Sequence, residues 1–189
     1  MRNNRVLFMV ETSIFAVLAL LFDLFNPLKL WPQGGSISFA MVPIFIIAFR
    51  WGLKGGLTAG FLYGLLQLII DPFIVTPIQV FVDYFLAFTV LGIAGVFAKQ
   101  TTTALQEHQK KKAAVYIIAG TFIGSLARFA AHFISGVTFF AEAAPAGTPV
   151  ALYSLSYNGS YMLPSFLLSA IITWVVLSSV PRLAIVKHT

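Results

Sequence analysis

The chain has 189 residues, of which 59% are hydrophobic and only 10% are charged. A water-soluble domain usually carries about 25% charged residues, so this composition predicts a protein that lies in a lipid bilayer. Six spanning helices of about 20 residues each would use most of the length and leave no room for a soluble catalytic domain. The chain lacks a G-x-x-x-x-G-K-[ST] phosphate-binding sequence and cysteine, so any ATP would be used by a partner, and no disulfide or thiolate metal site is expected.

Apolar runs bounded by Pro, Gly and charged residues predict an all-α, polytopic membrane protein with six transmembrane helices in one bundle. The runs cover residues 6–25, 37–49, 53–70, 78–97, 113–135 and 157–180. The second run is short and contains Pro43, so it needs neighbouring helices to satisfy its backbone. The polar segment 100–112 is predicted to be a helical extension or a linker. We expect residues 1–189 to form a single transmembrane substrate-binding domain.

The basic residues predict how this bundle is oriented. Ten of the 12 Lys and Arg residues fall in the tails or in the even-numbered loops, and only Lys29 falls in an odd-numbered loop. Since Lys and Arg are retained on the cytoplasmic side, both termini are predicted to be cytoplasmic. The same scattered distribution argues against nucleic acid as a partner, despite the net charge of +6. Pro and Gly in the outer loops 26–36 and 136–156 favour a lid over an outward-facing pocket, with simple connectors as the alternative.

Small residues mark the faces on which these helices are expected to pack. Gly56, Gly60 and Gly64 recur every fourth residue and predict a close helix–helix contact. The first helix presents a second small-residue face, which can meet either a helix of this chain or a partner subunit. This candidate docking face consists of Thr12, Ser13, Ala16 and Ala19.

Four ionisable residues lie inside the predicted membrane segments, where charge is costly and usually functional. Glu11, near the cytoplasmic end, can reach the headgroups or pair with Arg5. Asp83 is predicted in the outer part of the fourth helix, and Arg128 and His132 in the outer part of the fifth. Two interpretations stay open for this outer group: a structural ion pair between Asp83 and Arg128, or a ligand site formed by both helices.

Further polar and aromatic residues are predicted at the same outer level. Gln79 precedes Asp83 by one helical turn, and Asn158 offers both a hydrogen-bond donor and an acceptor. The set also includes Tyr84, His132, Phe140 and Tyr153. A carboxylate among aromatic rings suits an organic cation, through charge pairing and cation–π contact. A simple interfacial aromatic belt is the alternative for Tyr153 and for Tyr161.

At these residues the sequence resembles the thiamin-specific substrate-binding (S) component of energy-coupling factor transporters. The resemblance extends over nearly the whole chain and is carried by residues 32–36, 49–54, 79–88, 120–136 and 153–161. It implies a six-helix membrane protein that binds thiamin with high affinity from outside. It also implies docking on a membrane-embedded coupling subunit with two ATPase subunits, so that only these partners use ATP and the chain itself needs no cofactor.

The resemblance also implies roles for individual residues. The ligand contacts that it implies are Asp83, Tyr84, His132, Phe140, Tyr153, Asn158 and, as a cap from the outer loop, Trp31; Gln79 lies beside Asp83. Some members have Glu where this chain has the shorter Asp83, and Trp where it has Phe140. The family's docking face has alanines four residues apart, whereas this chain offers Thr12 with Ala16, or Ser13 with Val17.

Other functions remain to be weighed against thiamin capture. The ligand can be another vitamin, such as riboflavin or folate. An intramembrane enzyme would need paired carboxylates, a His-rich metal cluster or a Ser–His pair, whereas this chain has one deep acid in its outer half and one membrane histidine. A channel would need a polar path, yet the cytoplasmic halves of the third to fifth predicted helices are almost wholly apolar. We therefore expect a non-enzymatic binding subunit without a metal site.

Overall fold

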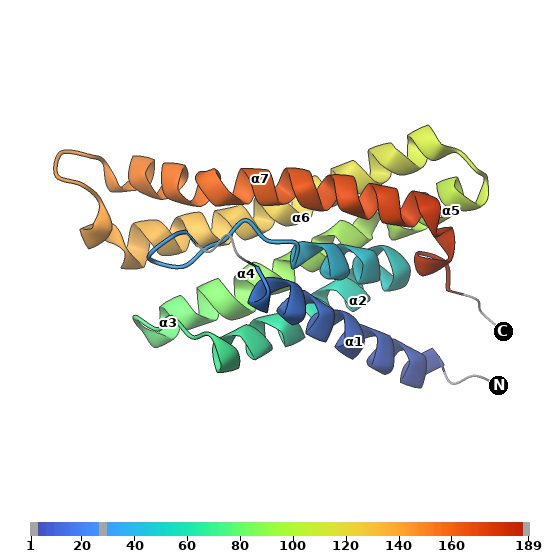
Figure 1. The fold of residues 1–189 in the computed structure, drawn as a ribbon, viewed down its shortest axis with the longest axis horizontal. Coiled ribbons are helices and arrows are strands. Elements are labelled where there is room, and N and C mark those ends of the chain that lie inside the picture. The colour runs from blue at the N-terminus through green and yellow to red at the C-terminus, as the bar shows by residue number, and fades with distance from the viewer. Residues whose placement is uncertain (1–3, 27–29, 187–189) are drawn as a thin grey trace.

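The computed structural model describes residues 4–26 and 30–186. Every regular element in these two ranges is a helix, which confirms the all-α part of the predicted fold class, and the long helices lie side by side along one direction (Figure 1). The long elements are α1 (Asn4–Leu24), α2 (Met41–Ile70), a helical rod spanning Pro77–Gln106, α6 (Lys110–Phe139) and α7 (Val150–Ser179).

Helix α2 folds back on itself at Gly52. This residue has φ 70° and ψ −163°, a conformation that glycine adopts and other residues do not tolerate without strain. A Cβ atom added to Gly56 would lie 2.6 Å from the Cβ atom of Ala48, whereas residues eight apart in a continuous helix are about 12 Å apart. The two halves of α2 therefore form a helical hairpin, and they correspond to the second and third predicted helices.

The rod Pro77–Gln106 changes its helical geometry along its length. It consists of α3 (Pro77–Val80), a π-helical segment (Phe81–Leu86), α4 (Ala87–Thr89), a 3₁₀ segment (Val90–Phe97) and α5 (Ala98–Gln106). Helix α5 extends the rod past residue 97 to Gln106, so the predicted helical extension 100–112 is helical in its first half. A turn follows at 107–109, and α6 begins at Lys110. The π-helical segment carries Asp83 and Tyr84, and π-helical turns are rare features that occur mostly at functional sites.

Helices α6 and α7 pack against each other and complete the bundle. A short 3₁₀ turn follows each of them, η3 (Ala141–Ala143) and η4 (Pro181–Leu183). Helix α7 begins at Val150, after Pro149, and not at residue 157 as predicted. The earlier start places Tyr153 inside the helix, one turn before Tyr157.

The described residues contain five helices that are long and apolar enough to cross a membrane: α1, α2, Pro77–Gln106, α6 and α7. The predicted count of six spans is not confirmed, because residues 37–49 and 53–70 fall within the single element α2. The half of α2 before Gly52 is only about 16 Å long at 1.5 Å per residue, about half the thickness of a bilayer core. The start of α1, the α5–α6 turn and η4 lie at one end of the bundle, and the α2–α3 and α6–α7 loops lie at the other (Figure 1).

Glycines bring α2 into close contact with the rod, as predicted, and glycines of α6 approach the rod in the same way. A Cβ atom added to Gly60 would lie 2.2 Å from the carbonyl oxygen of Phe88. A similarly close approach to the rod is made by Gly56, Gly64, Gly120 and Gly124. These contacts place backbone against backbone, which is how helices associate where lipid removes the hydrophobic driving force.

The small-residue face of α1 mostly packs inside this chain. Thr12, Ala16 and Ala19 are each at most 1% exposed, and α1 packs against α2. Ser13 is exposed. Of the four residues predicted as a docking face, three are therefore covered by the chain itself, and Ser13 alone lies on the outer surface.

A polar network joins α1, α2 and η4 at the end where the described chain begins and ends. Arg50 Nε and Nη2 donate to the two carboxylate oxygens of Glu11 at 2.6 and 2.8 Å. Trp51 Nε1 donates to the same carboxylate at 2.6 Å, and Arg50 Nη1 donates to the carbonyl oxygens of Arg182 and Ile185 at 3.0 Å. Glu11 thus has a structural role beside the α2 hairpin.

We expect Gly60→Ala to lower the stability of the bundle. The added methyl group would overlap the Phe88 carbonyl oxygen, and overpacking of this kind costs about 1–3 kcal/mol. Gly159→Ala is the matched control, because a Cβ atom there meets nothing within 4 Å and alanine favours a helix over glycine by up to about 1 kcal/mol. Thermal unfolding in detergent should show a lower midpoint than the wild type for Gly60→Ala and not for Gly159→Ala. Equal midpoints for the two variants would contradict the close contact between Gly60 and the rod.

Candidate ligand-binding cavity

A cavity of about 340 Å³ lies at the end of the bundle that contains the α2–α3 and α6–α7 loops. Its volume falls in the range of small-molecule sites, about 300–1,000 Å³. All eight residues predicted to contact a ligand line it: Trp31, Gln79, Asp83, Tyr84, His132, Phe140, Tyr153 and Asn158. The structure therefore brings the complete predicted set into one place, from the outer loop, the rod, α6 and α7.

The carboxylate of Asp83 accepts hydrogen bonds from three side chains. Its Oδ2 atom accepts from Gln79 Nε2 at 2.7 Å and from Ser135 Oγ at 2.8 Å, and its Oδ1 atom lies 3.0 Å from His132 Nδ1. The side chain is 14% exposed. The π-helical turn of the rod and one face of α6 thus hold a nearly buried carboxylate at the cavity wall.

His132 connects Asp83 with Arg128. Arg128 Nε donates to His132 Nε2 at 3.3 Å, and a guanidinium can only donate, so Nε2 is an acceptor and Nδ1 carries the proton of a neutral imidazole. The Arg128 guanidinium also lies 4.6 Å from the ring centroid of Phe88. Arg128 is therefore linked to Asp83 through the imidazole of His132, which differs from the direct ion pair considered above.

Gln79 and Tyr84 hold the loop that connects α2 and α3. Gln79 is 1% exposed, and its Nε2 atom donates to the carbonyl oxygen of Phe73 as well as to Asp83. Tyr84 Oη accepts from the N–H of Phe73 at 2.6 Å and donates to the carbonyl oxygen of Asp71 at 3.3 Å. Both residues line the cavity, and their polar atoms fix the loop and Asp83 in place.

Asn158 connects α7 with α6. Its Nδ2 atom donates to the carbonyl oxygen of Ser154 at 3.0 Å and to that of His132 at 3.4 Å. Its Oδ1 atom accepts from Tyr161 Oη at 2.7 Å. Both ends of the amide are thus bonded within the protein, so a ligand that reaches Asn158 would have to exchange with one of these bonds.

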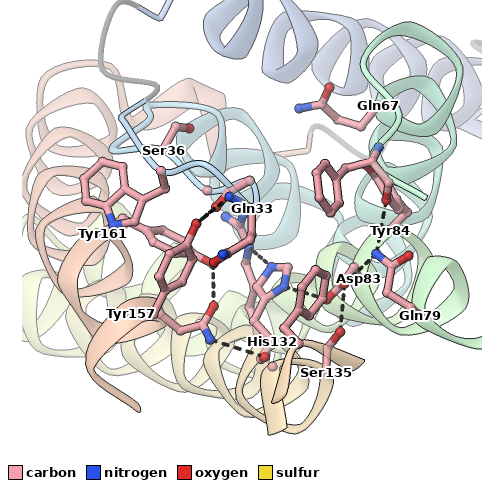
Figure 2. A pocket seen from close by; sticks show the side chains of 18 of the residues that line it. Gln33, Ser36, Gln67, Gln79, Asp83, Tyr84, His132, Ser135, Tyr157 and Tyr161 are labelled. Atoms are coloured by element: carbon pink, nitrogen blue, oxygen red, sulfur yellow. Dashed lines mark hydrogen bonds and ion pairs between the residues drawn. The ribbon is translucent and has the colours of Figure 1, made fainter. Parts of the chain in front are cut away.

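The outer loop lies across the cavity and is bonded to α7 through Gln33. Tyr153 Oη donates to Gln33 Oε1 at 2.8 Å, and Tyr157 Oη accepts from the Gln33 N–H at 2.9 Å. Figure 2 shows Gln33 beside Tyr157 and Tyr161 at the cavity. Tyr153 therefore has a specific partner and is more than a member of an aromatic belt.

Trp31 and Gly35 add further contacts between this loop and α7. Trp31 Nε1 donates to Ser160 Oγ at 2.8 Å, and its ring packs edge-on against Tyr161 with centroids 5.5 Å apart. Gly35 has φ 103°, and an added Cβ atom would lie 2.6 Å from the Tyr161 ring, so only glycine fits here. These contacts favour the interpretation of residues 30–36 as a lid over a mere connector.

The described lining of the cavity has a charge opposite to that of the chain. Among the described lining residues, Asp23, Asp71 and Asp83 carry carboxylates, and Arg128 carries a guanidinium. This is a formal charge of −2 with His132 neutral, whereas the chain carries +6. Aromatic rings line the same cavity, including Phe73, which stacks on Phe140 with ring centroids 6.0 Å apart. Such a lining favours an organic cation.

The sequence analysis missed a polar group on the α1 and α2 side of the cavity. Gln67 Nε2 donates to Asp23 Oδ2 at 2.5 Å and to Tyr63 Oη at 3.0 Å, and all three residues line the cavity. A signal was available, because Gln67 is an uncharged polar residue inside an apolar run. Among the described residues, no group of three His, Cys, Asp or Glu side chains is placed to hold a metal ion.

Comparisons with known proteins agree with this fold. The family model described as Thiamine transporter protein matches residues 9–185. The Thiamine transporter ThiT of Bacillus subtilis is 44% identical over 96% of both chains, and that of Lacticaseibacillus paracasei is 32% identical over 98% of this chain and 94% of the other. The solved structure of ThiT from Listeria monocytogenes is 33% identical, has a TM-score of 0.91 and covers 97% of this chain and 100% of the other. This chain is a membrane protein that belongs to the thiamine transporter family.

Proposed function

We propose that this chain binds thiamin with high affinity in the cavity around Asp83 and captures it from the outer side of the bacterial plasma membrane. The observation that carries the proposal is the acidic, aromatic cavity in a basic chain of the thiamine transporter family. Thiamin bears a permanent thiazolium charge and an aminopyrimidine edge. The carboxylate of Asp83 can meet either one, by charge attraction or by accepting a hydrogen bond from the amino group.

The ligand contacts that we propose are the predicted ones. The rings of Trp31 and Phe140 would cover the two sides of the ligand, and Tyr153 and Asn158 would approach it from α7. His132 would act together with Asp83, because its protonated Nδ1 atom faces that carboxylate. Gln79 and Tyr84 would mainly keep Asp83 and the α2–α3 loop in position.

The energy for uptake would come from other subunits. The family consists of transporters and not of enzymes, so the intramembrane-enzyme alternative is set aside. The chain has no nucleotide-binding motif, and we propose that a membrane-embedded coupling subunit and two ATPase subunits use the ATP. The coupling subunit would dock on the exposed side of α1, which includes Ser13.

We also propose a six-span topology with both termini in the cytoplasm. The two halves of α2, joined at Gly52, would be the second and third spans, and the short first half would rely on its neighbours within the bundle. The end that carries the cavity would face outward. The end that carries the Glu11–Arg50 network and Lys110 to Lys112 would face the cytoplasm, in agreement with the positive-inside rule.

The first expected outcome is that the isolated protein binds thiamin without ATP or any partner. Isothermal titration calorimetry of the detergent-solubilised protein measures this directly, and mass spectrometry identifies any small molecule that co-purifies. Riboflavin and folate serve as comparison ligands. Tight binding of one of these, with no binding of thiamin, would assign the cavity to another vitamin.

The second expected outcome concerns the charge of Asp83. Asp83→Asn should weaken thiamin binding by about tenfold or more, because hydrogen bonds to charged groups contribute about 1.5–3 kcal/mol and each 1.4 kcal/mol corresponds to a factor of ten. Glu142→Gln is the matched control, because it removes an exposed acid near the same end that does not line the cavity. Affinity and thermal stability should be measured together. A normal affinity with a lowered unfolding temperature would leave Asp83 a purely structural role.

The third expected outcome concerns topology. Single cysteines at Gln109, in the α5–α6 turn, and at Ala146, in the α6–α7 loop, should differ in their reaction with a membrane-impermeant thiol reagent in intact cells. The native chain has no cysteine, so each variant carries one reactive thiol. Only the cysteine at position 146 should be labelled. Labelling at position 109 would contradict the orientation that we propose.

A further inference from the structure

We propose that a groove between α5 and α6 binds the headgroup of one anionic phospholipid, of the class in which the phosphate is esterified to a hydroxyl-bearing alcohol such as glycerol. The groove lies beside the α5–α6 turn, at the end of the bundle opposite the ligand-binding cavity (Figure 1). This lipid site is therefore separate from the thiamin site and independent of the vitamin bound there. In the topology proposed above, the lipid belongs to the cytoplasmic leaflet.

The groove is formed by two helices that a tight turn holds together. Its volume is about 380 Å³. His108 in the turn has φ 57°, and the N–H of Gln109 donates to the carbonyl oxygen of Ala104 at 2.8 Å, so α6 runs back along α5. The lining residues that concern a headgroup come from α5, the turn and α6: Lys99, Thr103, Glu107, Gln109, Lys112 and Tyr116.

The ammonium groups of Lys99 and Lys112 make the groove attractive to an anion. Both side chains are exposed, and within residues 4–26 and 30–186 neither has an ion pair. The carboxylate of Glu107 also lines the groove and accepts a hydrogen bond from Gln109 Nε2 at 2.7 Å. The described lining therefore has a net formal charge of +1, which favours a lipid with net negative charge over a zwitterionic one.

The polar groups beside the lysines favour a headgroup with hydroxyl donors. The Glu107 carboxylate, the Gln109 amide oxygen and the Thr103 hydroxyl oxygen are hydrogen-bond acceptors. Glycerol hydroxyl groups can donate to them while the phosphate accepts from the two ammonium groups. A phosphate without such an alcohol would leave Glu107 next to an anion and without a donor. A glycerol phosphodiester thus uses both kinds of group in the groove.

Apolar side chains extend from the groove toward the interior of the membrane. Val96 lies three residues before Lys99 on the same face of the rod and is 56% exposed. Ile123 follows Tyr116 by about two turns of α6 and is 40% exposed. The ring of Tyr116 stacks on Phe97 with centroids 6.3 Å apart. An acyl chain can lie along these side chains, which a free phosphate ion would not use.

The depth of the groove also fits a lipid headgroup. Pro77 begins the rod, and the distance along it to Lys99 is roughly 30 Å at the rise of a helix. This length is about the thickness of the hydrocarbon core, so the Lys99 ammonium group lies where the core ends. Tyrosine is enriched at the same level, as Tyr116 is here. Basic pockets between transmembrane helices at this level are typical binding sites for anionic headgroups.

The lysine run at the start of α6 contains its own control. Lys112 lines the groove, whereas Lys111 does not, because adjacent residues project about 100° apart around a helix. Both are exposed and carry the same charge. A built site therefore depends on Lys112, whereas a diffuse attraction between a basic surface and anionic lipid depends equally on both.

The test measures the binding of dioleoyl phosphatidylglycerol to the full-length protein in a neutral detergent, by native mass spectrometry over a range of lipid concentrations. Lys99→Gln and Lys112→Gln should each weaken binding about fivefold, and the double variant about 25-fold. Lys111→Gln should change it less than about twofold. All four variants should unfold at the wild-type temperature without lipid, because surface substitutions rarely alter stability.

Two further ligands separate the lipid from other sources of the same chemistry. Dioleoyl phosphatidylcholine, which has the same chains and no net charge, should bind at least about tenfold more weakly to the wild type. Glycerol 1-phosphate, which has the headgroup and no chains, should not displace the lipid at equal concentration.

Four results would overturn the lipid site. Equal binding of the two phospholipids would remove the role of the charge, and equal losses in Lys111→Gln and Lys112→Gln would show a diffuse attraction. Displacement by glycerol 1-phosphate at equal concentration would show a site for a soluble phosphate. Wild-type lipid binding by the double variant, with failure to assemble with the coupling subunit, would assign the groove to a protein partner.

Discussion

A carboxylate that is nearly withdrawn from water needs hydrogen-bond donors, and the donors of Asp83 organise the whole cavity. Gln79, His132 and Ser135 supply them from the rod and from α6. Gln79 also bonds the carbonyl oxygen of Phe73, so the α2–α3 loop depends on the same anion. An unpaired buried charge destabilises a fold far more than a paired one. The rod, α6 and the α2–α3 loop are therefore held in the relative arrangement that keeps the hydrogen bonds of Asp83.

The bundle separates its charges into two distant groups. Asp83 and Arg128 lie at the cavity end, and Glu11 and Arg50 lie at the opposite end, beside the hairpin at Gly52. The described core between them contains large apolar side chains such as Phe45, Phe49, Leu91 and Ile117. No chain of ionisable side chains connects the two groups in the described residues. This arrangement suits a protein that binds a cation at one end and relies on other subunits to move it.

Much of this architecture can be predicted from one sequence because polar side chains are rare in membrane-spanning segments and therefore easy to recognise. An ionisable side chain within an apolar run has no ordinary reason to be there. This criterion singled out Glu11, Asp83, Arg128 and His132, of which the last three line the cavity, whereas Glu11 bonds to Arg50 at the opposite end. The break between the second and third predicted helices, at residues 50–52, was also visible in the sequence, because Gly52 follows the basic Arg50 and the aromatic Trp51. The sequence could not show that Gly52 has positive φ and joins the two segments into one folded-back element.

Which residues would bond to each other was harder to predict, and the reason is geometric. Arg128 and His132 are four residues apart on one face of α6, so both can approach a carboxylate on the rod, and the π-helical turn at Asp83 decides in favour of the imidazole. The bond between Gln67 and Asp23 joins residues 44 positions apart. Asp23 is near the end of its apolar run, where an acid normally reaches the headgroups, so its position alone does not signal burial. Ionisable residues at the ends of spans therefore need a structure before they can be assigned, whereas those deep inside spans can be assigned from the sequence.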